Sequence, residues 1–172
     1  EDGNQIWINK GNLKFEYIKS ALPLPDYKEE TREIDVADID NDGDLDLFLA
    51  NVKFLVGEKA FNRVLLNDGK GHFTDATSTW LPNNLEYQSV DVDFVDFNED
   101  NFPDVIIANA FGNPHQILIN TGVRFLDKTS EYLDNTYTNG IDVEVLDMNN
   151  DGILDIYFTG FQTADSLLFG NK

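Results

Sequence analysis

The sequence predicts an all-β fold built from repeated units of four antiparallel strands. Three observations support this prediction. Short apolar and alternating runs recur along the 172 residues, and no helical periodicity extends over a useful length. An acidic loop between two strand-like runs also occurs three times. These loops begin at Asp38, Asp96 and Asp147, so the repeats are spaced 58 and 51 residues apart.

The first two strands of each unit lie on either side of the loop. The first strand alternates apolar and polar residues, which indicates a strand with one polar face. It covers residues 34–37, 90–95 and 141–146 in the three copies. The second strand is a continuous apolar run, as expected for a strand packed between neighbouring units. It covers residues 45–50, 105–108 and 156–159.

The third and fourth strands form a hairpin. Third strands occupy residues 5–11, 63–69, 116–122 and 166–171, and the first three copies end in Asn-x-Gly. Asn and Gly tolerate the positive φ angles of tight turns. Fourth strands occupy residues 13–17, 72–76 and 124–128. Each contains a phenylalanine at the same place, Phe15, Phe73 or Phe125, which we expect to pack on the core rather than on a ligand.

Four antiparallel strands in a unit of about 50 residues match one β-propeller blade. We therefore predict β-propeller blades, about three in number, as a partial propeller or part of a larger assembly. Residues 1–172 form a single segment with blade parts 1–31, 32–77, 88–128 and 139–172.

The repeated loop has the composition of a calcium site. Each copy places oxygen-bearing side chains at loop positions one, three, five and nine. Calcium takes six to eight oxygen ligands in flexible geometry, and alternating Asp and Asn side chains supply them as the backbone curls round the ion. Position seven is Asp44, Phe102 or Ile153, so it has no common side chain, which fits a backbone carbonyl ligand. A single copy is also compatible with a surface turn, but three copies with one spacing predict three Ca²⁺ sites.

The loop, together with the following Leu-x-Asn-x-Gly-x-Phe run, resembles the FG-GAP/VCBS repeat, the blade of integrin-alpha-like β-propellers. The resemblance covers essentially the whole chain. It implies a calcium-stabilised scaffold, secreted or at the cell surface, that serves in adhesion, ligand binding or assembly. The family's calcium positions fall on Asp38, Asp40, Asp42, Asp44 and Asp46, on Asp96, Asn98, Asp100, Phe102 and Asp104, and on Asp147, Asn149, Asp151, Ile153 and Asp155.

The second loop departs from the family pattern. Asn101 stands where Gly is usual, and Pro103 precedes the last ligand. Asn is the best non-glycine residue for a left-handed turn. We therefore expect this site to survive with weaker calcium binding.

Composition narrows the classes of partner. The net charge of −20 disfavours nucleic acid and anionic membrane surfaces. No apolar run reaches membrane-spanning length, so we expect no membrane insertion. The chain has no cysteine, which excludes thiolate metal sites. It begins at Glu1 with no signal peptide, so we expect it to be processed or excised. Weak calcium loops suit an extracellular, cell-surface or periplasmic location, where calcium is plentiful.

Acidic residues also recur on the first strands, three and five positions before each loop. They are Glu33 and Asp35, Asp91 and Asp93, and Asp142 and Glu144. First strands line the channel of a propeller, so two interpretations stay open. These side chains form either a cation or polyol site or a solvated channel wall.

Catalysis has little support in the sequence. The two histidines, His72 and His115, lie at a hairpin and at the start of a third strand, without a Ser or Cys partner. We therefore predict a non-enzyme. The alternative is a carbohydrate-binding or catalytic propeller of a secreted polysaccharide-active enzyme, since carboxylates abound. Aromatic residues in the longer loops are candidates for sugar or peptide contacts. They are Tyr27, Phe54, Phe61, Trp80, Tyr87, Phe111, Tyr132, Tyr137 and Phe161.

The strand count predicts partners at both ends of the segment. The chain opens on strands three and four of a blade and closes on strands one to three of another. About three blades are too few for a closed ring, and exposed strand edges recruit partners. We expect further blades of the same parent or other protein chains, as a homo-oligomer or filament.

Overall fold

The structure, a computed structural model, describes residues 4–23, 25, 27–55, 57–82, 86–133 and 139–170. The strands of these residues form four antiparallel sheets. The first sheet contains β1 (Trp7–Asn9) and β2 (Phe15–Tyr17), and the second contains β3 (Thr31–Ala37), β4 (Asp46–Asn51), β5 (Arg63–Asn67) and β6 (Phe73–Asp75). The third contains β7 (Ser89–Val95), β8 (Asp104–Asn109), β9 (Gln116–Asn120) and β10 (Phe125–Asp127). The fourth contains β11 (Gly140–Leu146), β12 (Asp155–Gly160) and β13 (Ser166–Leu168). Tyr137 lies outside the described residues.

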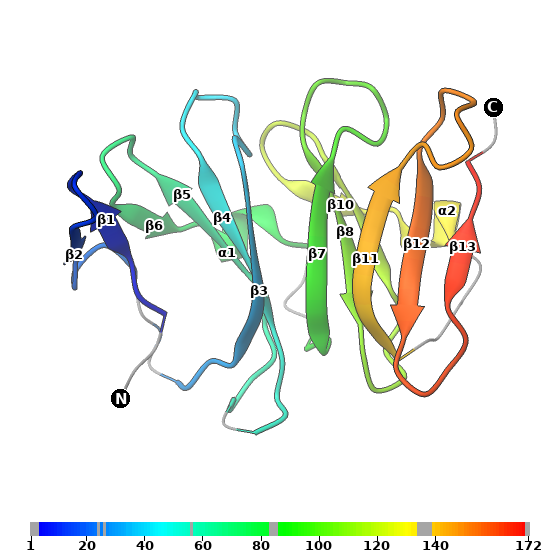
Figure 1. The fold of residues 1–172 in the computed structure, drawn as a ribbon, viewed down its shortest axis with the longest axis horizontal. Coiled ribbons are helices and arrows are strands. Elements are labelled where there is room, and N and C mark those ends of the chain that lie inside the picture. The colour runs from blue at the N-terminus through cyan, green and yellow to red at the C-terminus, as the bar shows by residue number, and fades with distance from the viewer. Residues whose placement is uncertain are drawn as a thin grey trace.

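The sheets follow one another in a row, face to face, with β3, β7 and β11 as neighbouring first strands (Figure 1). Within each sheet, strands consecutive in the chain pair side by side. The three acidic loops connect first to second strands along one edge of the row, at the top of Figure 1. The β4–β5, β8–β9 and β12–β13 loops lie along the opposite edge (Figure 1). This arrangement confirms the all-β prediction of successive four-strand blades.

Two buried apolar clusters hold the row together. The first joins the β3–β6 sheet to the β7–β10 sheet and includes Ile39, Phe48, Trp80, Leu118 and Phe125. The second joins the β7–β10 sheet to the β11–β13 sheet. It includes Ile106, Ile117, Leu133, Ile156 and Phe158. Strand β8 contributes side chains to both clusters, so it is buried along its whole length. This burial on both faces explains its continuous apolar run.

Two one-turn helices follow the fourth strands, where the sequence indicates only loops. They are α1 (Thr77–Trp80) and α2 (Thr129–Tyr132). Four residues are too few to show helical periodicity. Helix α1 turns Trp80 into the first cluster, where it is 5% exposed. Trp80 is therefore a core residue, which removes it from the candidates for sugar or peptide contacts.

The fourth-strand aromatics do not share one environment. Phe125 is fully buried, with its ring centroid 5.6 Å from that of Trp80. Phe15 is 58% exposed, so the expectation of core packing was wrong for this residue. The difference arises because the β3–β6 sheet covers β10, whereas no sheet of the described residues covers β2 in the same way.

No helix among the described residues has the length and apolarity needed to cross a membrane.

Candidate metal centres

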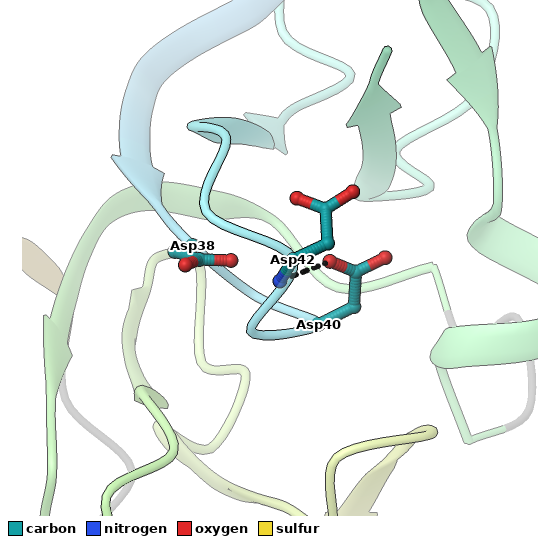
Figure 2. Close-up of side chains that lie close together, drawn as sticks. All are labelled: Asp38, Asp40 and Asp42. Carbon is teal, nitrogen blue, oxygen red and sulfur yellow. Dashed lines mark hydrogen bonds between the residues drawn. The ribbon is translucent and has the colours of Figure 1, made fainter. Parts of the chain in front are cut away.

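The first loop brings three carboxylates together. One oxygen from each of Asp38, Asp40 and Asp42 lies within 4.8 Å of the others, and Figure 2 shows the three side chains projecting from one turn of the chain. Backbone N–H groups hold all three: Asp42 donates to Asp40 Oδ1, Gly43 donates to Asp38 Oδ2, and Asp44 donates to Asp42 Oδ1. Burial, and then repulsion from Asp42, raises the pKa of Asp40.

Asp38 provides the test of whether these residues fit a cation. Its Oδ1 atom is buried and has no hydrogen-bond partner. An unpaired buried carboxylate oxygen is costly unless a cation or donor compensates it. Beside two further carboxylates, this atom gives the donor set that a hard divalent cation prefers. The residues therefore fit calcium, which Asp38, Asp40 and Asp42 would hold through carboxylate oxygens.

The second and third loops have the same hydrogen-bond pattern. Asp96 accepts from the backbone of Asp100 and Asn101, and Asp147 accepts from that of Asp151 and Gly152. Two features differ from the first loop. There, the backbone N–H of position five, Asp42, donates to Asp40 and not to Asp38. The position-three Asn98 and Asn149 side chains donate to Asp100 and Asp151 at 2.9 and 3.0 Å. An amide donor therefore reduces repulsion that the all-carboxylate first loop retains.

Two residues in each loop have positive φ angles. At position six the values are 96° for Gly43, 69° for Asn101 and 85° for Gly152, which confirms that Asn101 replaces glycine in a left-handed turn. Position four is also left-handed, at Asn41, Glu99 and Asn150. The sequence predicted the left-handed turn at position six but not the one at position four. Together these angles curl the backbone so that alternate side chains face one space.

The position-nine aspartates are more deeply buried than the other ligand candidates. Asp46, Asp104 and Asp155 are at most 1% exposed. In each, one oxygen accepts the backbone N–H of loop position two and the other accepts an N–H at the end of the third strand. Burial raises the pKa of Asp46, and raises that of Asp104 to about 6. These residues hold the loop against its own blade. Only the lone pairs that remain on their carboxylate oxygens are available to a metal ion.

The position-seven side chains lie beside the third-strand turn in the first two blades. A Cβ atom on Gly69 would lie 2.5 Å from Asp44, and one on Gly122 would lie 2.8 Å from Phe102. This contact explains why the turn needs glycine for space as well as for φ. In the third loop, Ile153 lies against Gly170.

Two asparagines that the sequence did not single out support the first two loops. Asn67 donates through Nδ2 to the carbonyl of Leu45, and Asn120 donates to that of Pro103. Asn120 also reaches the carbonyl of Ile39 in the preceding blade, at 2.9 Å. Gly170 stands at the equivalent position of the third blade, so no side-chain amide is available from this position. The Asn of the repeated Asn-x-Gly tail was the available signal.

The chain matches a model of the FG-GAP-like repeat over residues 1–49, 54–107 and 96–158. The chain belongs to the FG-GAP-like repeat family. No curated protein matches it. The segments 1–49 and 54–107 each contain one acidic loop start, at Asp38 and Asp96, and the overlapping segment 96–158 contains the loop starts at Asp96 and Asp147.

The acidic first-strand residues of the FG-GAP-like repeats join neighbouring blades. Asp35 accepts the backbone N–H of Phe94 at 3.1 Å, Asp91 that of Val143 at 2.7 Å, and Asp93 that of Val145 at 3.0 Å. These three carboxylates are therefore structural acceptors between β3, β7 and β11, a role that neither sequence interpretation included. Burial raises the pKa of Asp93, and raises that of Asp91 to about 6.

The two histidines of the FG-GAP-like repeats have different surroundings. His72 is exposed, and its Nδ1 lies 3.5 Å from Asp68 in the same hairpin. His115 is 1% exposed, and its Nδ1 accepts the N–H of Asn109 at 3.1 Å. Burial lowers the pKa of His115 to about 4. The described geometry gives His115 a packing role between two blades.

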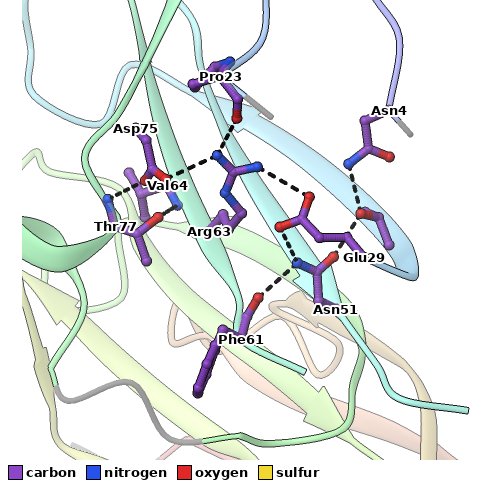
Figure 3. Close-up of polar contacts among 10 residues, drawn as sticks. Asn4, Pro23, Glu29, Asn51, Phe61, Arg63, Val64, Asp75 and Thr77 are labelled. Atoms are coloured by element: carbon purple, nitrogen blue, oxygen red, sulfur yellow. Dashed lines mark hydrogen bonds and ion pairs between the residues drawn. The ribbon is translucent and has the colours of Figure 1, made fainter. Parts of the chain in front are cut away.

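A buried ion-pair network lies away from the loops. Arg63 donates to Glu29 at 3.1 Å, to Asp75 at 3.0 Å and to the carbonyl of Pro23 (Figure 3). Burial raises the pKa of Glu29 against the opposing charge of Arg63. The network joins the segment before β3 to strands β5 and β6 of the same sheet, so we assign it a structural role.

Proposed function

We propose that this chain is a calcium-stabilised extracellular β-propeller scaffold for adhesion, ligand binding or protein assembly. The observation that carries the proposal is the unpaired, buried Oδ1 of Asp38 beside two carboxylates. The loop sequence and its two left-handed φ angles recur in the other two blades, which extends the proposal to three Ca²⁺ sites. Bound calcium would remove repulsion among these oxygens and stabilise the fold by linkage.

The proposed location is extracellular or at the cell surface, with the periplasm as the bacterial equivalent. Calcium sites of modest affinity fill only where free calcium is plentiful. The proposed partners are other protein chains or further blades, and carbohydrate. The net charge of −20 argues against nucleic acid.

Calorimetric titration with calcium tests the proposal directly. We expect three ions per chain and a higher melting temperature in calcium than in chelator. Asp38→Ala should remove one ion. Asp68→Asn is the matched control, because Asp68 is an aspartate of an exposed tight turn outside the loops. An absence of calcium uptake would defeat the proposal.

A second candidate function is carbohydrate binding, alone or within a polysaccharide-active enzyme. The rings of Phe54 and Phe111 stack with centroids 5.5 Å apart, yet the side chains are 60% and 58% exposed. Glu30 holds this loop by accepting the backbone N–H groups of Leu55 and Gly57. An ordered, exposed aromatic pair suits stacking on a sugar ring. A glycan array on the wild type and Phe54→Ala tests carbohydrate binding, and turnover of a polysaccharide by the wild-type chain would favour the enzyme.

A further inference from the structure

A pocket with a volume of about 270 Å³ lies beside the Arg63 network, where β5 begins and β6 ends. Its lining combines two aromatic rings with a carboxylate, a guanidinium and two hydroxyls. The residues are Tyr27, Phe61, Arg63, Asp75, Thr77 and Ser78. Pockets for drug-sized ligands usually measure about 300–1,000 Å³. The volume therefore suits a smaller ligand, of the size of a single ring.

The carboxylate of the pocket is held in a fixed orientation. Arg63 donates to Asp75 Oδ2 at 3.0 Å, and the backbone N–H of Thr77 donates to Asp75 Oδ1 at 2.9 Å (Figure 3). Burial acts to raise the pKa of Asp75, but the bonds from Thr77 and the charge of Arg63 outweigh it, so the pKa is lowered. The side chain is 43% exposed. Its two oxygens offer about four acceptor positions, more than these bonds use, so Asp75 can accept a hydroxyl of a ligand.

A lysine holds the two aromatic rings. Lys59 Nζ lies 4.7 Å from the centroid of the Tyr27 ring and 5.6 Å from that of the Phe61 ring. An ammonium group within about 6 Å of a ring centroid is attracted to the face of that ring. Both aromatic residues are half-buried. The rings therefore present ordered apolar surface to the pocket.

The next blade repeats only part of this arrangement. Asp127 Oδ1 accepts the backbone N–H of Thr129, so the Asp–Thr turn recurs with the repeat. The aromatic and basic positions do not recur, because Pro114 and Gln116 stand there in place of the phenylalanine and the arginine. That blade forms its four strands without them. The parts of the pocket that the repeat does not need for folding are those that give it aromatic surface and fix its carboxylate.

The charges around the pocket decide between classes of ligand. The positive charges of Arg63 and Lys59 match the negative charges of Glu29 and Asp75 in number. Neither a cation nor an anion therefore gains a net attraction from these four groups. A neutral ligand with hydroxyls and an apolar face suits the lining, because hydroxyls donate to a carboxylate and the face packs on aromatic rings. A pyranose ring has both features.

We propose that this pocket binds one neutral pyranose residue of a carbohydrate, with its hydroxyls donating to Asp75 and its ring packing against Tyr27 and Phe61. The inference rests on carbohydrate binding, the second candidate function above. It gives that function a site separate from the exposed pair of Phe54 and Phe111.

NMR titration of the protein in calcium tests the inference. The probes are the neutral methyl pyranosides of glucose, galactose, mannose and fucose. We expect at least one to bind saturably with a Kd of about 0.1–10 mM, the weak affinity of a contact with one ring. Amide shifts should cluster at Phe61, Thr77 and Ser78. The charged probes choline and methyl glucuronide should bind more weakly than that glycoside.

Two variants with matched controls locate the site. Asp75→Asn keeps the shape of the side chain but removes the charge of the acceptor, so binding should weaken by about tenfold or more. Ser78→Ala removes an exposed hydroxyl without a change to the core, and should weaken binding by about threefold. Asp127→Asn and Ser130→Ala are the controls, because these residues hold the same places in the next blade. Both controls should bind as the wild type does.

Four results would overturn the inference: no saturable binding of any of the four glycosides, tighter binding of a charged probe, equal losses in Asp75→Asn and Asp127→Asn, or shifts confined to Phe54 and Phe111. The last result would keep carbohydrate binding and move it to the exposed pair. Calcium uptake is titrated on the same sample. Glycoside binding without calcium uptake would defeat only the calcium scaffold, and calcium uptake without glycoside binding would defeat only this inference.

Discussion

The imidazole of His115 lies parallel to the ring of Phe158 in the next blade, with ring centroids 3.9 Å apart and 7° between the planes. Both side chains are buried. A Cβ atom on Gly140 would lie 2.6 Å from His115 Cε1, so the first strand of that blade also closes on the imidazole. His115 is therefore part of the packing between two blades.

This packing predicts a pH-dependent stability. The pKa of His115 is lowered to about 4 by burial, below its ordinary value of 6.5. The unfolded chain then binds the proton first as pH falls, so the fold loses stability from about pH 6.5 downward. From pH 7 to pH 5 the loss should be about 2 kcal/mol. The free energy of unfolding, measured with urea at several pH values, should fall with pH more steeply in the wild type than in His115→Gln. The same pH dependence in both proteins would contradict the prediction.

The titration of Asp91 should change the stability in the opposite direction as pH falls. Its pKa is raised to about 6 by burial, with Asp142 of β11 and Glu33 of β3 as neighbouring charges. A raised carboxyl pKa gives stability that is present at low pH and lost as pH rises through about 6. Relative to Asp91→Asn, the wild type should therefore gain stability from pH 7 to pH 5. Solvent screening keeps the gain below about 1 kcal/mol. A loss over this interval would contradict the assignment.

The carboxylate bonds between first strands give a third prediction. Asp93→Ala leaves the N–H of Val145 without its acceptor, so it should cost about 1–2 kcal/mol. Glu144→Ala is the matched control, because Glu144 holds the equivalent position in β11 and is exposed. It should change the free energy of unfolding by less than about 0.5 kcal/mol. Equal losses in chemical denaturation would show that Asp93 acts through its charge alone.

The three loops should differ in calcium affinity. The first has Asp40 at position three, whereas the second and third have Asn98 and Asn149. Affinity rises with the number of charged ligands, so the first loop should bind most tightly. Asn98→Asp should tighten the second site and lower the stability of the calcium-free chain by removing an amide donor to Asp100. Titration calorimetry and melting in chelator measure the two effects, and a second site that is unaffected would refute the ranking.

The sequence predicted what depends on periodicity. The alternation of 90–95 and the apolar run of 105–108 gave β7 and β8 to within a residue or so. It could not predict environments set by the neighbouring blade. Trp80 and Phe15 are both aromatic residues near a fourth strand, yet one is buried and the other exposed. The acceptor role of Asp93 likewise depends on β11, which lies about 50 residues away in the chain.

The last prediction concerns coupling between the first two loops. Asn120 is fully buried and donates through Nδ2 to Pro103 in its own blade and to Ile39 in the preceding one. Asn67 donates only within its own blade, to Leu45. Asn120→Ala leaves two carbonyls without this donor and should cost about 2–3 kcal/mol.

Because one amide joins both loops, Asn120→Ala should weaken calcium binding at the first and second sites together. Asn67→Ala, the matched control, should weaken the first site alone, because its donor acts only on the Leu45 carbonyl of that loop. Calorimetric titration of the two variants, with Asp147→Ala added to silence the third loop, separates the sites. If Asn120→Ala changes only the second site, the bond to Ile39 carries no coupling, and the loops act as independent calcium sites within their own blades.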